Sequence, residues 1–346
     1  MDSEKASQIT TNFTPPHPLK TAVLFLIFNR PDTTKEVFEA IRRAKPPKLY
    51  VAADGPRADK SGEHEKCEQV RWMATQVDWD CEVKTLFRDK NMGCGEAVSS
   101  AITWFFENEE EGIILEDDCL PHQDFFYFCE ELLNRYRYDD DVMSIGGTNF
   151  LKGIRRGESS YYFSSHFHVW GWASWRRAWI KYDYEAKNMT EERLRVILDR
   201  RFISSGEKRL YKNTFNDIKI RKVDTWDYQW FFTHLFSAGL TIIPNVNLVT
   251  NIGPDGTHFS NNYKNPRINL PTRTIFPLVL NKNKKPDKKA DLLLYRLNFK
   301  QNIMEQFFKK IIKSGEFIDR KYFFGALKKT TKLHYKKVSN DTENLS

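Results

Sequence analysis

The fold is decided by the stretch G-I-I-L-E-D-D at residues 112–118. Its first four residues form an apolar run, which is typical of a strand buried on both faces of a parallel sheet. Its last three residues are carboxylates, at the point where that strand should end. In open α/β sheets, ligands bind in the crevice at the carboxyl ends of the strands. The stretch therefore predicts a buried parallel strand with a polar site at its end.

The sequence on either side alternates between strand and helix patterns. An apolar stripe at 3–4 spacing before residue 112 predicts one helix, and a second apolar stripe follows Asp118. Such alternation predicts an α/β fold with a mainly parallel, doubly wound sheet. Earlier strands are predicted at residues 22–28, 49–53 and 82–87, and late strands at 241–243 and 246–249.

Composition shifts divide the chain into four expected segments. Glycines break the pattern beyond about residue 142, and the composition turns to Lys and Asn from residue 281. The segments are a flexible lead-in (1–20), an α/β half (21–141), a second half of the same domain (142–280) and a basic helical tail (281–346).

The composition of the 346 residues excludes several classes of protein. With 40% apolar residues, the chain can bury a core and is not mainly disordered. Its five scattered cysteines include no C-x-x-C pair, which speaks against a disulfide scaffold or a zinc cage and for a reducing compartment. We expect no signal peptide, and the longest clean apolar run, 22–28, is too short to span a membrane. A cytoplasmic protein is expected.

The net charge of +8 is concentrated in the tail. Residues 281–346 hold 17 Lys and Arg against 7 Asp and Glu, whereas the rest of the chain holds 37 against 39. The near-neutral body does not suggest a nucleic-acid groove. An apolar stripe at 303–312, beside lysines, is typical of a basic amphipathic helix. We expect the tail to dock on an anionic membrane surface or, alternatively, to pack on the catalytic domain.

The carboxylates Glu116, Asp117 and Asp118 allow two interpretations. Adjacent carboxylates repel one another unless a cation neutralises them, and a hard divalent ion with oxygen ligands would do so. Alternatively, the three residues are an acidic cluster at a helix N-terminus, where negative charge is favoured. Taken alone, the triplet leaves both open.

Four segments occur in an order that resembles the nucleotide-sugar-binding half of GT-A-fold glycosyltransferases. The closest likeness is to the inverting N-acetylglucosaminyltransferases that initiate complex N-glycans and to their bacterial relatives. The resemblance implies that Arg30 and Asp54 contact the nucleotide, Asp54 at the uracil ring, together with Glu116 and Asp117, and that Asp118 binds the metal. The segments are 23–30, 50–57, 91–96 and 113–126.

Three later segments extend the resemblance to about residue 262. Residues 169–175 resemble the family's G-W segment near the donor sugar, 226–230 its W-D-x-W segment, and 253–259 a late loop over the diphosphate. The likeness implies Asp227 as catalytic base, sugar contacts at Gly171, Trp172 and Trp226, and a diphosphate loop with Gly256, Thr257 and His258, the last also a metal ligand. The chain departs from the family at Tyr228, in place of a second Asp, and at Thr257, in place of Ser.

The implied reaction is inverting transfer of a sugar from a UDP-sugar to an acceptor hydroxyl, assisted by Mn²⁺ or Mg²⁺. The acceptor would be a cell-surface or lipid-linked glycan, reached at the inner face of the membrane. Two alternatives are a nucleotidylyltransferase that makes the sugar nucleotide and a non-catalytic sugar-binding module. The first strand lacks the Gly-rich phosphate loop that a nucleotidylyltransferase usually shows, and a sugar-binding module leaves the acidic triplet unexplained.

Each assigned residue also has a structural interpretation. Arg30 could be a surface charge, Asp54 a turn residue before Gly55-Pro56, and Asp227 a helix cap. Trp172 could be a core aromatic and His258 an ordinary loop histidine. The backbone amides at Gly93 and Gly95 could face phosphate at a helix start, although a short glycine pair is a weak signal.

Overall fold

The computed structural model describes residues 17–253 and 267–300. The chain divides into two units, residues 1–288 and 289–346. Gly256, Thr257 and His258 lie outside the described residues, as does the apolar stripe at 303–312. No described helix is long and apolar enough to cross a membrane.

The described part of the first unit is built on a large mixed sheet in the order β3-β2-β1-β4-β8-β6-β9-β7. β1 pairs in parallel with β2 and β4, and β2 with β3, so the first half is a parallel sheet. The strands are β1 (Val23–Ile27), β2 (Lys48–Ala53), β3 (Glu82–Phe87), β4 (Glu111–Glu116), β6 (Val142–Gly146), β7 (Tyr161–Ser164), β8 (Trp172–Trp175) and β9 (Leu240–Pro244). The expected α/β class with a mainly parallel sheet is confirmed.

Helices connect the parallel strands, and further helices follow in the second half. Those of the first half are α1 (Pro31–Ala44), α2 (Glu63–Ala74), α3 (Cys94–Asn108) and α4 (Gln123–Arg135). Those of the second half are α5 (Arg176–Trp179), α6 (Glu191–Arg201), α7 (Ser205–Lys219) and α8 (Asp227–Phe236). Described by itself, the start of the second unit continues α9 (Lys288–Tyr295) into a π-helical turn, Arg296–Lys300.

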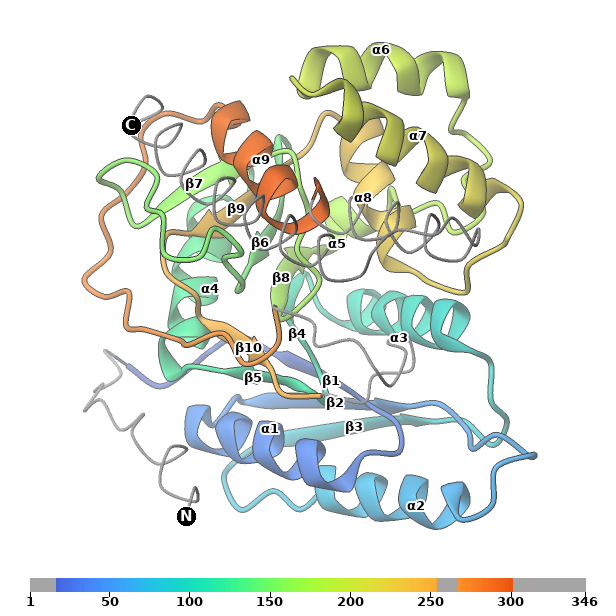
Figure 1. Cartoon of the computed structure of the whole chain (residues 1–346). Helices are drawn as coiled ribbons and strands as arrows, with labels where there is room; N and C mark the ends of the chain where they lie inside the picture. Colours follow the sequence, from blue (N-terminus) through green and yellow to red (C-terminus); the bar gives the residue numbers. More distant parts are fainter. Residues whose placement is uncertain (1–16, 254–266, 301–346) are drawn as a thin grey trace, which may run out of the picture. The chain divides into compact units, whose positions relative to one another are not determined.

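Alternating side chains of the central strands fill two separate cores, one on each face of the sheet. Phe25 belongs to the core that also contains residues of α1, α2 and α4. Leu24 and Leu26 belong to the core that contains residues of α3 and the tryptophans of the second half. Figure 1 shows α1 and α2 on one side of β1–β3 and α3 on the other. Because both faces are covered, β1 reads as an uninterrupted apolar run.

The second half departs from a simple parallel repeat. β8 lies between β4 and β6 and runs antiparallel to both, so β6 has the same direction as β4. β9 is parallel to β6, and β7 is antiparallel to β9. A small second sheet pairs β5 (Cys119–Pro121) with β10 (Val249–Asn251). The late strand expected at 241–243 is confirmed, whereas the one expected at 246–249 begins only at Val249.

Candidate functional site

The candidate site lies at the carboxyl edge of the parallel half of the sheet. Because β1, β2 and β4 are parallel, the residues that follow them meet at the same edge. β1 leads to Arg30, β2 to Asp54, and β4 ends in Glu116, followed by Asp117 and Asp118. The topology thus brings together the polar groups that the sequence places up to about 90 residues apart.

Arg30 pairs with two of the carboxylates. One guanidinium nitrogen lies 2.6 Å from Oδ2 of Asp118 and another 3.0 Å from Oδ1 of Asp117. The second oxygen of Asp117 also accepts a hydrogen bond of 3.2 Å from the backbone N–H of Phe28. Asp117 and Asp118 are buried, at 2% and 7% exposure. Arg30 is therefore the cation of this edge and not an isolated surface charge.

The positive charge of Arg30 does not remove the electrostatic cost of three adjacent carboxyl groups at residues 116–118. Burial and the neighbouring carboxylates Asp118 and Asp117 raise the pKa of Glu116 to about 8. Burial also raises the pKa of Asp117 to about 7, against the lowering effect of Arg30. Burial alone would lower the pKa of Arg30, but Asp117 and Asp118 raise it well above its ordinary value. Oε1 of Glu116 is buried and has no hydrogen-bond partner among the described residues.

Gly253 covers the Arg30–Asp118 pair. A Cβ built on Gly253 would lie 2.6 Å from Oδ2 of Asp118 and 2.8 Å from a guanidinium nitrogen of Arg30, so only glycine fits here. The backbone N–H of Ile252 donates to the carbonyl of Asp118 at 2.9 Å. The late loop expected over a diphosphate therefore starts against this ion pair.

The donor types at the edge fit a hard divalent cation, since carboxylate oxygens are the ligands such ions prefer. Two features support this fit, namely the excess of carboxylates over Arg30 and the unpartnered Oε1 of Glu116. Nevertheless, within residues 17–253 and 267–300 no group of three or more His, Cys, Asp or Glu side chains is arranged as a metal cage. In the arrangement described, Arg30 supplies the neutralising charge.

Asp54 joins the turn after β2 to the loop before α3 through hydrogen bonds. Its two carboxylate oxygens accept hydrogen bonds from the backbone N–H of the adjacent Gly55 and from three N–H groups that lie 37–39 residues further along the chain. Burial raises the pKa of Asp54, and these hydrogen bonds lower it. A contact between Asp54 and a uracil ring stays a prediction, because the uracil N–H would compete for the carboxylate with the N–H donors that already bond to it. These donors are Gly55 N, Met92 N, Gly93 N and Asn91 Nδ2, at 2.9–3.2 Å.

Replacing Asp54 with Asn should destabilise the protein by about 1–3 kcal/mol, because an amide nitrogen would face donors that need acceptors. Hydrogen exchange at the amides of Met92 and Gly93 should accelerate, which mass spectrometry can measure. Asp59→Asn, in the exposed turn nearby, is the matched control and should change neither quantity. Unchanged stability with lost UDP affinity would instead assign Asp54 to the nucleotide.

Glu63 is a site-organising residue that the sequence did not reveal. Its carboxylate is 5% exposed, and it accepts hydrogen bonds from the Arg57 side chain, the Arg57 backbone N–H (2.7 Å) and Nδ2 of Asn29 (2.7 Å). The Arg57 guanidinium also lies 5.6 Å from the centroid of the Phe28 ring. Glu63 thus joins the turn after β2 to the end of β1. Nothing in its sequence surroundings signals this contact.

The Arg57 side chain, above all, lowers the pKa of Glu63 to about 2, from an ordinary value of 4.5. A carboxyl whose pKa is lower in the folded state stabilises the fold above pH 4.5 and loses that contribution as the pH falls toward 2. Glu63→Gln should therefore cost about 1–3 kcal/mol at pH 7 and flatten the stability curve between pH 4.5 and 2. Denaturant unfolding across this range measures both. Glu65→Gln, exposed on the same helix, should leave the curve unchanged.

Asp227 is the first residue of α8 and lies at the same edge as Glu116. Its Oδ1 accepts hydrogen bonds from the Thr225 hydroxyl and from the backbone N–H of Tyr228 (2.9 Å). The helix cap itself is Trp226, so the cap interpretation of Asp227 is not what the structure shows. The negative charge of Asp227 contributes to the raised pKa of Glu116. The predicted base therefore lies within electrostatic reach of the acidic run.

Asp224 is a second residue that the sequence did not reveal. Its two oxygens accept hydrogen bonds of 2.9 Å from the backbone amides of Cys94 and Gly95, at the start of α3. A carboxylate of the chain, and not a phosphate, occupies this helix N-terminus. Burial first, and then the charges of Glu116, Asp224 and Asp227, raise the pKa of the Cys94 thiol to about 12. The loop before α8 and the end of β4 thus converge on α3.

Trp172 and Trp226, expected at the sugar, lie in the core. They are 0% and 3% exposed and stack on each other with ring centroids 5.7 Å apart. Trp172 belongs to β8, a strand inserted between β4 and β6, and this buries both faces of its ring. The core interpretation is therefore the one that burial favours. Gly171, with φ +63°, lets the chain enter β8, since a Cβ there would lie 2.7 Å from Val249.

No protein-family profile matches the chain, and no curated protein sequence matches it. Similar solved structures include a UDP-glucose pyrophosphorylase complexed with UDP-glucose, at 10% identity over 65% of this chain and 90% of that chain, with a TM-score of 0.34. S. aureus TarS (1–349) has 10% identity over 68% of this chain and 61% of that one, with a TM-score of 0.36. HddC from Yersinia pseudotuberculosis has 9% identity over 45% and 77%, with a TM-score of 0.29. The fold class rests on the sheet itself.

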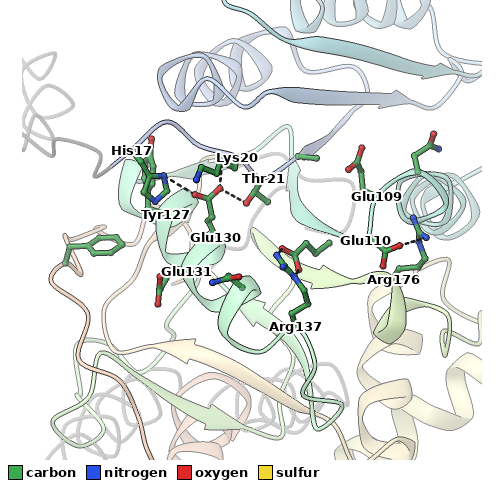
Figure 2. Close-up of a pocket in the computed structure, with 15 residues that line it drawn as sticks. His17, Lys20, Thr21, Glu109, Glu110, Tyr127, Glu130, Glu131, Arg137 and Arg176 are labelled. Carbon is green, nitrogen blue, oxygen red and sulfur yellow. Dashed lines mark hydrogen bonds and ion pairs between the residues drawn. The ribbon is translucent and has the colours of Figure 1, made fainter.

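A cavity of about 560 Å³ lies at the opposite, amino-terminal edge of the sheet (Figure 2). Several glutamates line it, and the four named here have hydrogen-bond or ion-pair partners within the chain. Glu130 accepts from the backbone N–H of Lys20 and the hydroxyl of Thr21, as Figure 2 shows. Because three of the glutamates pair with cations and Glu130 is hydrogen-bonded to the chain before β1, we take the carboxyl edge and not this cavity as the candidate site. The other pairs are Glu109–Lys48, Glu110–Arg176 and Glu111–Arg137.

Proposed function

We propose that the protein transfers a sugar from a UDP-sugar to an acceptor hydroxyl, with inversion. The observation that carries the proposal is the meeting of Arg30, the Glu116–Asp118 run and Asp227 at the carboxyl edge of a parallel sheet. That edge is where open α/β sheets bind ligands. The group includes a cation able to meet a diphosphate and a carboxylate able to accept a proton.

Asp227 would accept the proton of the acceptor hydroxyl as that oxygen attacks the anomeric carbon. General-base help of this kind contributes roughly 10²–10⁴-fold to the rate. The Thr225 hydroxyl and the Tyr228 amide both bond to Oδ1 of Asp227 and so fix the plane of its carboxylate. A carboxylate held in one orientation would deprotonate an acceptor hydroxyl on one face of the donor sugar only.

Arg30 would donate to the diphosphate oxygens of the donor. A guanidinium presents its N–H groups as a fork that suits phosphate. When bound, a Mn²⁺ or Mg²⁺ ion held by Asp118 would stabilise the charge of the departing UDP. The excess of carboxylates over Arg30 supports metal dependence, because an acidic edge repels a diphosphate that arrives without a cation. His258 stays a proposed second metal ligand.

The test is incubation of the full chain with a panel of UDP-sugars and Mn²⁺, with and without EDTA. Metal-dependent release of UDP, and an inverted anomeric configuration in the product by NMR, are the expected results. Formation or consumption of pyrophosphate would identify a nucleotidylyltransferase instead. If the chain neither binds UDP in calorimetry nor turns over any donor, the transferase proposal is wrong.

A further inference from the structure

An aromatic cluster with one guanidinium lies in the loops of the second half of the sheet. The Cζ atom of Arg267 is 5.8 Å from the ring centroid of Phe150 and 5.9 Å from that of Trp170. The two rings meet edge to face, with centroids 5.3 Å apart. Phe150 follows β6 and Trp170 precedes β8, while Arg267 comes from a segment more than 90 residues further along.

His168 packs against the cluster and is itself hydrogen-bonded to the backbone. Its Nδ1 lies 2.9 Å from the carbonyl oxygen of Thr148, and its ring centroid is 4.8 Å from that of Phe150. Burial lowers the pKa of His168 to about 3, so the ring is neutral. The hydroxyl of Thr148 donates to the carbonyl of Trp170 at 3.0 Å, which joins the two loops. A prearranged group of this kind costs little to order on binding.

The cluster lies at the same carboxyl edge of the sheet as the end of β4. β6 and β4 have the same direction, so the loop after β6 is at the carboxyl edge too. Tyr228 follows Asp227 in the chain and is 38% exposed. Burial raises the pKa of Tyr228, the charge of Asp227 raises it further, and that of Arg267 lowers it.

The charge of these loops is opposite to that of the acidic edge. Residues 148–158 contain Lys152, Arg155 and Arg156 against one acid, Glu158, and residues 267–273 contain two arginines and no acid. Both loops bond to Asn247, whose Oδ1 accepts from Asn149 N (3.0 Å) and whose carbonyl accepts from Arg273 N (3.0 Å). Arg156 pairs with Asp287 at 2.8 Å, so these loops are basic in sequence while part of their charge is balanced within the chain.

We propose that Trp170, Tyr228 and Arg267 form an acceptor subsite that takes a saccharide carrying an anionic substituent, a carboxylate or a phosphate. Sugar rings stack on aromatic faces through their apolar C–H surfaces. A guanidinium binds a carboxylate or phosphate through charge-assisted hydrogen bonds. This inference rests on the proposed transferase function and adds the class of acceptor to it. The group that the acceptor brings to Arg267 also orients its hydroxyl toward Asp227.

The test measures binding of four probes to the full chain in the presence of UDP and Mn²⁺. Two are acidic, a tetrasaccharide with glucuronate residues and a tetrasaccharide phosphate, and two are their neutral methyl esters. We expect an acidic probe to bind about tenfold or more tightly than its ester. Arg267→Gln should remove this preference, and Arg267→Lys should restore part of it. Arg43→Gln, an exposed arginine of α1, is the matched control and should leave all four affinities unchanged.

Tyr228→Ala should weaken the acidic probe and its ester to a similar extent, because the ring contact does not depend on charge. Equal affinity for acid and ester, binding of neither acidic probe, or an Arg267→Gln loss shared equally by both would overturn the proposal. UDP binding by the unmodified protein is measured in the same series. Absence of UDP binding marks failure of the transferase function, whereas UDP binding without acid preference marks failure of this inference alone.

Discussion

Asp227→Asn is expected to lower the rate of sugar transfer by roughly 10²–10⁴-fold while UDP affinity stays within twofold of its original value. The amide keeps the shape of the carboxylate and can still accept from the Thr225 hydroxyl and the Tyr228 amide through its oxygen. It cannot take a proton from the acceptor. Steady-state rates of UDP release in the presence of acceptor, together with calorimetry of UDP binding, measure the two quantities.

The matched control is Asp199→Asn on α6, a partner of Lys208 on the surface. It should leave both the rate and the UDP affinity unchanged. Two results would remove Asp227 from the role of base: a transfer rate near the original in Asp227→Asn, or retention of the anomeric configuration in the product. Retention would mean that the acceptor does not attack the anomeric carbon opposite the departing UDP, as the proposed single displacement requires.

Arg30→Met should destabilise the fold by about 3 kcal/mol and abolish measurable UDP binding. Asp117 and Asp118 are buried, and Arg30 is the cation with which they pair. Breaking a buried pair leaves uncompensated charge, which costs about 3–5 kcal/mol, and the lower end applies here because the Arg30 side chain is partly exposed. Denaturant unfolding and calorimetry with UDP and Mn²⁺ measure the two effects.

Two further variants make this result interpretable. Arg43→Met, at an exposed position of α1, should change neither stability nor UDP binding. Arg30→Lys should recover part of the stability, since it returns the charge without the fork that reaches both carboxylates. Original stability in Arg30→Met would show that the carboxylates are neutralised in another way, and would leave the raised pKa values of Glu116 and Asp117 as the mechanism.

The sequence predicted the parallel half of the fold well, because its signals there are local. The run at 22–28 and the run at 112–115 are each buried on both faces, and that alone identifies them as inner strands. Parallel strands end at one edge, which explains why Arg30 lies against the carboxylates of residues 116–118, a pairing that was not predicted from the sequence. The role of Arg30 as their partner follows from that topology.

The sequence did not predict the second half of the fold in the same way. Trp172 lies in a Trp-rich, Gly-flanked stretch that fits an open sugar-binding loop and a core strand equally well. Only the insertion of β8 between β4 and β6 places the ring in the core. Neighbouring strands of this kind lie far apart in the sequence. The local sequence pattern of a strand does not predict which other strand will pair with it.

What the sequence determined by itself is the alternation of buried strands and helices, the mainly parallel sheet, and the acidic end of β4 at its carboxyl edge. Tertiary structure alone decided which donors each carboxylate receives. Asp54 bonds to amides 38–39 residues away, and Asp224 bonds to amides 129–130 residues away. The periodicity of apolar residues predicts which side chains are buried, and this can be recognised within one segment of the sequence. A hydrogen bond joins two residues that can be far apart in the sequence, and their distance in space is fixed only when the whole sheet has formed.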